Sequence, residues 1–141
     1  LSVGYKIPKK NILLSTGPVQ SKAELLESCK LLIENDYNLF ATRGTHKFLK
    51  DNNVESQLLY WPDEKQSPNT IEYLRKRKID LVINIPKNLS KNELDNDYEI
   101  RRSSIDFNIP LITNSRLAQA FINAFCKKDL EDISIKHWDE Y

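Results

Sequence analysis

The chain has 141 residues, of which 40% are hydrophobic and 29% are charged, and its formal charge is +1 because 21 basic residues nearly balance 20 acidic ones. This length predicts one domain whose core is large enough to fold without a metal or a disulfide. The balanced charge argues against a nucleic-acid-binding protein, and the sequence holds no apolar run of about 18 residues that would predict a membrane span.

The chain contains two cysteines and no methionine. Cys29 and Cys126 each fall within a helical apolar pattern, which predicts buried thiols in a reducing compartment. The first ten residues lack the apolar core of a secretion signal, so we expect a cytoplasmic protein. Because the sequence begins with Leu1 rather than methionine, we expect it to be a segment of a longer polypeptide.

Strand-like and helix-like segments alternate along the chain. In chain order we expect a strand at residues 11–15, a helix from Ser21 to Ile33, a strand at 37–42, a short helix from Thr45 to about 52, a strand at 54–61, a helix from Ser67, a strand at 80–84, a surface loop at 87–96, a helix at 97–107, a strand at 110–113 and a final helix from Asn114 or Ser115. The residues from 129 onward are weakly patterned.

The expected helices carry recognisable start signals. Ser21 with Glu24, and Asn69 with Glu72, have the spacing of a capping box, and Pro68 suits a first helical turn. The last helix has an apolar face at helical spacing. That face comprises Leu117, Ala118, Phe121, Ile122 and Phe125.

This alternation predicts a parallel five-stranded sheet with right-handed crossovers, in a three-layer α/β sandwich. In such sheets ligands bind beyond the carboxyl ends of the strands. Hydroxyl and amide side chains and one indole gather there: Ser15, Thr16, Thr42, Thr45, Trp61, Asn84, Thr113 and Asn114.

The Thr42-x-x-Thr45 spacing opens a helix whose free N–H groups and dipole favour an anion such as phosphate or carboxylate. The same residues are equally typical of simple helix caps, Trp61 of a core residue, and Lys22 of a solvated charge.

Other chemistries find less support. With three glycines and no glycine-rich phosphate loop, the chain lacks the backbone requirements of dinucleotide and P-loop binding. His46 and His137 have no ligands at metal spacing, and neither cysteine has an adjacent base. The acidic clusters at residues 63–65 and 95–97 are more typical of exposed loops than of acid–base catalysis.

Four ordered motifs resemble the methylglyoxal-synthase-like family. These are Ala-Thr-Arg-Gly-Thr at residues 41–45, Ile-Asp-Leu-Val-Ile-Asn at 79–84, Ile-Arg-Arg at 100–102 and Asn-Ile-Pro-Leu-Ile-Thr at 108–113. The similarity runs from about residue 10 to 125 and most resembles the allosteric domain at the C-terminal end of carbamoyl-phosphate synthase large subunits. It implies the strand order 3-2-1-4-5, with residues 1–9 as a lead-in from the synthetase body and 10–141 as the regulatory domain.

The enzyme branch of this family uses an aspartate after a Gly-Gly pair and a histidine in the loop after the fourth strand. Residues 64–69 contain no aspartate, and Leu94 stands about where the histidine would be. The resemblance therefore implies an effector-binding domain that needs no cofactor and is not itself an enzyme. The parent chain would be an ATP-dependent ligase that makes carbamoyl phosphate for pyrimidine and arginine biosynthesis.

The resemblance leaves the effector open. Ser15, Lys22, Thr42, Thr45 and Asn84 match positions of a UMP or IMP site, whereas Trp61 and Pro86 replace a lysine and a threonine there. The ammonia-dependent branch, activated by N-acetyl-L-glutamate, shares Trp61-Pro62, Asn84-x-Pro86 and Asn96, but it has an asparagine where Lys87 restores a positive charge.

The expected effector-binding residues are thus Ser15, Lys22, Thr42, Thr45, Trp61, Asn84, Lys87 and Asn96. The expected partners are the small-molecule effector, the rest of the synthase large subunit and oligomer contacts, without nucleic acid or membrane. Two alternatives remain: a stand-alone lyase of the same fold, and a domain kept mainly for subunit contacts.

Overall fold

The computed structural model describes residues 10–64, 66–86 and 91–126. The strands of this part are β1 (Asn11–Thr16), β2 (Asn38–Ala41), β3 (Gln57–Leu58), β4 (Leu81–Ile85) and β5 (Leu111–Ile112). They pair in parallel in the order β3-β2-β1-β4-β5, which confirms the predicted fold. The predicted lead-in at 1–9 and the tail at 127–141 lie outside the described residues.

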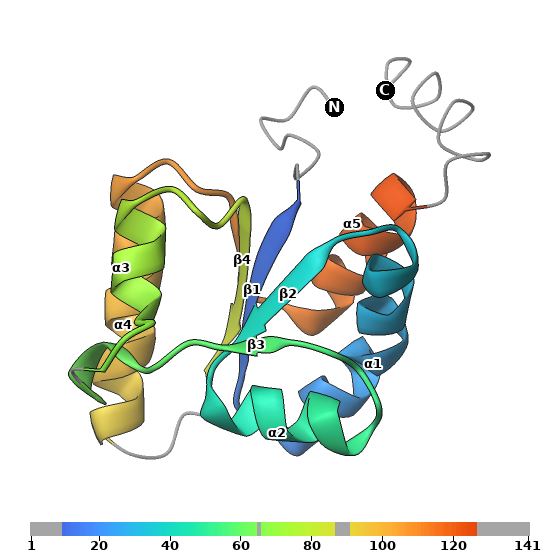
Figure 1. Cartoon of the computed structure of the whole chain (residues 1–141), viewed down its shortest axis with the longest axis horizontal. Coiled ribbons are helices and arrows are strands. Elements are labelled where there is room, and N and C mark those ends of the chain that lie inside the picture. The colour runs from blue at the N-terminus through green and yellow to red at the C-terminus, as the bar shows by residue number, and fades with distance from the viewer. Residues whose placement is uncertain (1–9, 65, 87–90, 127–141) are drawn as a thin grey trace.

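Helices cover both faces of this sheet (Figure 1). They are α1 (Val19–Glu34), α2 (Arg43–Asp51), α3 (Thr70–Arg75), α4 (Lys91–Asp106) and α5 (Ser115–Cys126), with a 3₁₀ turn, η1 (Pro62–Glu64), before α3. Figure 1 shows α1 and α5 on one face and α3 and α4 on the other, which confirms the three layers. No helix of the described part is long and apolar enough to cross a membrane.

The central strands β1 and β4 supply both halves of the core. Ile12 and Leu14 of β1 pack in the cluster on the α1–α5 face, whereas Leu13 packs with Val82 in the cluster on the α3–α4 face. All four side chains are at most 1% exposed. Because both faces of these strands are buried, their sequences read as continuous apolar runs rather than as alternating patterns.

The register of the strands brings their polar ends to one edge of the sheet. Leu14 of β1 lies beside Ala41 of β2, so Ser15 and Thr42 follow at the same level. On the other side Ser15 pairs with Asn84 of β4. Residues almost 70 positions apart in the chain are therefore neighbours at the carboxyl edge of the sheet, where the sequence predicted a ligand site.

Two predicted helix starts are wrong. The α1 helix begins at Val19 rather than at Ser21, and Pro18 occupies its N-cap position with φ −66° and no side-chain cap. The fixed φ of proline suits entry into a helix directly after the strand. The α2 helix begins at Arg43, so that Thr42 is its N-cap residue and Thr45 lies inside the helix.

The third strand is much shorter than the predicted 54–61. After Leu58, the backbone N–H of Leu59 donates to Ala41 O at 2.9 Å, but that of Tyr60 donates to Pro68 O at 2.8 Å. The chain therefore leaves β2 at this point and pairs with the segment before α3. Strand propensity in the sequence did not reveal this change of hydrogen-bonding partner.

The predicted loop at residues 87–96 is also wrong in its second half, because α4 begins at Lys91. Asparagine and aspartate are poor helix formers, so this polar run suggested a solvated loop. Asn96 and Asp97 are instead 8% and 3% exposed and make hydrogen bonds inside the fold. Their polarity belongs to a buried cluster rather than to a water-exposed segment.

The remaining start signals are largely confirmed. Asn69 and Glu72 form the predicted capping box of α3, although Pro68 lies before the helix rather than in its first turn. At α5, Asn114 is the cap, since its Oδ1 accepts from Leu117 N at 2.9 Å. Leu117 itself is 51% exposed, so it does not belong to the buried face predicted for that helix.

Both cysteines are buried, as predicted, and burial raises the pKa of the Cys29 thiol from 9.0 to about 12.

We expect Cys29 of a Cys126→Ser variant to react with a disulfide reagent at pH 8 at least about a hundredfold more slowly when folded than in denaturant, since the thiolate is the nucleophile. The thiol of the unfolded chain ionises at a lower pH than the buried thiol of the folded chain. The contribution of Cys29 to the free energy of unfolding therefore falls as the pH rises from 9 to 12. Rapid labelling of the folded variant would contradict this burial.

Candidate anion-binding site

A cavity of about 210 Å³ opens at the carboxyl ends of β1 and β2. Its lining comes from the end of β1, the first turns of α1 and α2, the residue before η1, and α4. The lining residues are Thr16, Gly17, Lys22, Thr42, Arg43, Gly44, Thr45, Trp61 and Asp97. The cavity therefore lies where ligands bind in parallel α/β sheets.

The first turn of α2 faces this cavity without a side-chain cap. The hydroxyl of Thr42, the N-cap residue, donates to Ser15 Oγ at 3.1 Å and makes no cap hydrogen bond to the helix. The first turn also contains no acidic residue. The free N–H groups and the positive end of the helix dipole thus favour a negatively charged group in the cavity.

Thr45 fixes the end of β1 against this helix. Its hydroxyl accepts from Thr16 N at 2.9 Å and donates to Thr16 O at 3.1 Å. The next residue, Gly17, is held by a hydrogen bond from its N–H to Ile85 O at 2.8 Å. The strand end that lines the cavity is therefore attached to both α2 and β4 before any ligand binds.

The hydroxyl of Thr16 is left without a partner. Thr16 is 3% exposed and lines the cavity, and its Oγ1 makes no hydrogen bond within the described residues. A buried hydroxyl without a partner costs about 1–3 kcal/mol, so this group is suited to a ligand that supplies the missing bond. Thr16 was expected at the strand edge but not among the effector-binding residues, where the family resemblance pointed to its neighbour Ser15.

Two basic side chains lie at the same helix end. A Cβ added to Gly44 would come within 3.3 Å of Lys22 Nζ, which places that ammonium beside the first turn of α2. The guanidinium of Arg43 forms an ion pair with Glu64, whose hydrogen bond and charge raise the pKa of Arg43. The absence of a side chain at Gly44 leaves room for Lys22 to approach.

The acidic member of the cavity is Asp97. It is 3% exposed, and its Oδ1 accepts from Asn84 Nδ2 at 3.0 Å. The Oδ1 of Asn84 in turn lies 3.4 Å from a donating nitrogen of Arg101. Asn84 is thus fully buried behind the cavity and orients the carboxylate that lines it.

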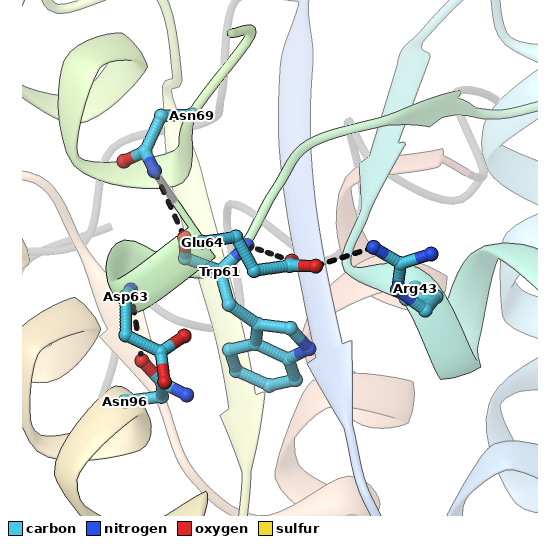
Figure 2. A network of polar contacts seen from close by, with 6 residues as sticks. All are labelled: Arg43, Trp61, Asp63, Glu64, Asn69 and Asn96. Carbon is cyan, nitrogen blue, oxygen red and sulfur yellow. Dashed lines mark hydrogen bonds and ion pairs between the residues drawn. The ribbon is translucent and has the colours of Figure 1, made fainter. Parts of the chain in front are cut away.

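The structure brings most of the predicted site residues together. Lys22, Thr42, Thr45 and Trp61 line the cavity, while Ser15 and Asn84 hydrogen-bond to lining residues from behind. Asn96 lines a neighbouring groove of about 690 Å³ between η1, α3 and α4, and its Oδ1 accepts from Asp63 N at 3.3 Å (Figure 2). Lys87 lies outside the described residues.

The arrangement is suited to an anionic ligand. No group of three or more histidine, cysteine, aspartate or glutamate side chains within residues 10–64, 66–86 and 91–126 is placed to hold a metal ion. The fold is that of a small α/β domain with a cavity at the carboxyl edge of its sheet. Residues 24–113 match the family model described as the MGS-like domain, and the chain belongs to this family.

Similar proteins include several that contain much more than this domain. The multifunctional protein ura1 of Schizosaccharomyces pombe is 37% identical over 90% of this chain and 6% of its own length. The multifunctional protein pyr1-3 of Dictyostelium discoideum is 39% identical, with 88% and 6% coverage. The mitochondrial carbamoyl-phosphate synthase [ammonia] of Homo sapiens is 37% identical over 100% of this chain and 10% of its own length. The chain thus spans 6–10% of the length of these relatives.

A solved structure shows the same fold. The crystal structure of methylglyoxal synthase from Elizabethkingia anophelis superposes with a TM-score of 0.58 and 18% identity, and the match covers 82% of this chain and 79% of that one. At this identity the likeness concerns the fold alone. It agrees with the strand order described above.

We expect substitutions of the two threonines at the β1–α2 contact to affect the free energy of unfolding differently. Thr45→Val leaves the buried backbone N–H and carbonyl of Thr16 without their partner, so we expect a loss of about 1–3 kcal/mol in the free energy of unfolding. Thr16→Val removes a hydroxyl that has no partner, so we expect an unchanged or higher value. Urea unfolding followed by circular dichroism measures both, and an equal loss in the two variants would contradict the assignment of Thr16 as unpartnered.

Proposed function

We propose that the chain is the effector-binding regulatory domain of a carbamoyl-phosphate synthase large subunit. The observation that carries this proposal is the buried hydroxyl of Thr16, which has no hydrogen-bond partner among the described residues and belongs to a residue that lines a cavity at the uncapped first turn of α2. A buried polar group at a positive helix end is suited to a ligand rather than to stability of the empty domain. The name of one relative, the mitochondrial carbamoyl-phosphate synthase [ammonia] of Homo sapiens, supports this parent enzyme.

The effector is proposed to place one anionic group in the cavity. A volume of about 210 Å³ is below the usual range for a complete small-molecule site, so the rest of the ligand would extend past the indole of Trp61. UMP and IMP offer a phosphate for the helix end, and N-acetyl-L-glutamate offers a carboxylate. Lys22 and the two threonines, Thr42 and Thr45, surround this position.

The consequence for the parent enzyme is regulation rather than chemistry in this domain. An effector changes activity when it binds two states of the synthase with different affinity. We propose that occupancy of this pocket biases ATP-dependent formation of carbamoyl phosphate at sites elsewhere in the large subunit. The product would supply pyrimidine or arginine synthesis, depending on the parent.

Calorimetric titration of the chain with UMP, IMP and N-acetyl-L-glutamate tests the proposal. We expect one of the three to bind, and Thr16→Val to weaken that ligand about tenfold, because the hydroxyl loses a hydrogen bond to a charged group. Thr113→Val is the matched control, since Thr113 is an exposed threonine beyond β5 that does not line the cavity.

Two results would overturn the proposed function. One is the absence of binding by all three compounds, or equal weakening in the Thr16→Val and Thr113→Val variants. The other is the formation of methylglyoxal from dihydroxyacetone phosphate by the wild-type chain, which would establish a lyase instead.

A further inference from the structure

Two basic side chains lie at the first turn of α2. Arg43 is the first residue of the helix, the ammonium of Lys22 lies beside Gly44, and the turn itself contains no acidic residue. The dipole of a helix opposes cations at its N-terminus. Basic side chains at this helix end add to the attraction for an anion in the cavity that they line. Arg43 was not among the site residues expected from the sequence.

Arg43 lines the cavity, and its guanidinium contacts two residues of the segment 60–64. It pairs with the carboxylate of Glu64 (Figure 2). Its central carbon also lies 5.7 Å from the ring centre of Tyr60. The Arg43 side chain is 59% exposed and that of Glu64 22% exposed. An ion pair so open to water contributes little to stability and can be exchanged for another anion.

Glu64 does not depend on Arg43 for its position. Its Oε1 accepts from Trp61 N at 2.7 Å, and its own N–H donates to Trp61 O at 3.0 Å. Asn69 Nδ2 also donates to Trp61 O, at 2.9 Å, as Figure 2 shows. The η1 turn is therefore closed by its own hydrogen bonds and keeps its form when Arg43 turns away. Asp97, whose carboxylate belongs to a residue that lines the cavity, accepts from Asn84.

We propose that Arg43 is a further effector-binding residue and that Glu64 is its built-in competitor. In the empty domain Glu64 neutralises Arg43. In the bound state the anionic group of the effector, already at the helix end and Lys22, takes the guanidinium from Glu64. This inference rests on the proposed function. It assigns part of the affinity for the anionic group to the exchange of Arg43 from Glu64 to the effector.

The test is a double-mutant cycle on the chain, titrated with whichever of UMP, IMP and N-acetyl-L-glutamate binds the wild type. We expect Arg43→Gln to weaken binding about tenfold, because a charge-assisted contact is lost. We expect Glu64→Gln to tighten binding about threefold, because an exposed competing pair is removed. In the Arg43→Gln background, Glu64→Gln should have no effect.

Asp63→Asn is the matched control. It removes one negative charge at the position next to Glu64, and Figure 2 shows that the carboxylate of Asp63 lies apart from Arg43. We expect it to change affinity less than about twofold. Glutamine at position 64 retains an oxygen for Trp61 N, and an unchanged thermal midpoint confirms that η1 is intact.

The outcomes separate this inference from the proposed function. Binding that is weakened by Thr16→Val but unaffected by Arg43→Gln and Glu64→Gln leaves the effector pocket in place and overturns the exchange. Weaker binding by Glu64→Gln at an unchanged thermal midpoint also overturns it, since the carboxylate would then support the ligand. Absence of binding by the wild type overturns both.

Discussion

The hydroxyl of Thr45 makes two hydrogen bonds with the backbone of Thr16, and the geometry of the pocket depends on them. They hold the end of a fully buried strand against the first turn of α2, so that the strand end and the helix end face one space. Thr42 contributes from the other side by donating to Ser15 rather than to its own helix. The two threonines therefore fix the strand edge and leave the helix N–H groups available, which a pair of simple caps would not do.

Much of the fold could be predicted because the signals were local or periodic. Unbroken apolar runs at residues 11–15 and 80–84 predicted central parallel strands, and the Thr42-x-x-Thr45 spacing placed two hydroxyls at the strand edge. The expectation that Trp61 lies near these threonines came from its position at the predicted end of the third strand, and its place in the cavity lining agrees with it. Whether these residues bind an effector stays a prediction.

The parts that could not be predicted depend on contacts between distant segments. The Thr16 hydroxyl has no partner because the hydroxyl of Thr45 bonds to the backbone of Thr16 and not to its side chain. The early start of α4 follows from the burial of Asn96 and Asp97, whose partners come from η1 and β4. The start of α1 after Pro18 rather than at Ser21 could have been predicted, since the Gly17-Pro18 pair marks a turn directly before the helix.

The cavity is lined by segments that span residues 16 to 97, and these include both the end of the central strand and elements from opposite faces of the sheet. A ligand in this position would act as a clamp that joins the two layers of helices through one anionic group. By mass action a ligand present at a hundred times its dissociation constant raises the free energy of unfolding by about 2.7 kcal/mol. Such a ligand would therefore stabilise the end of the central strand and both layers of helices together against unfolding.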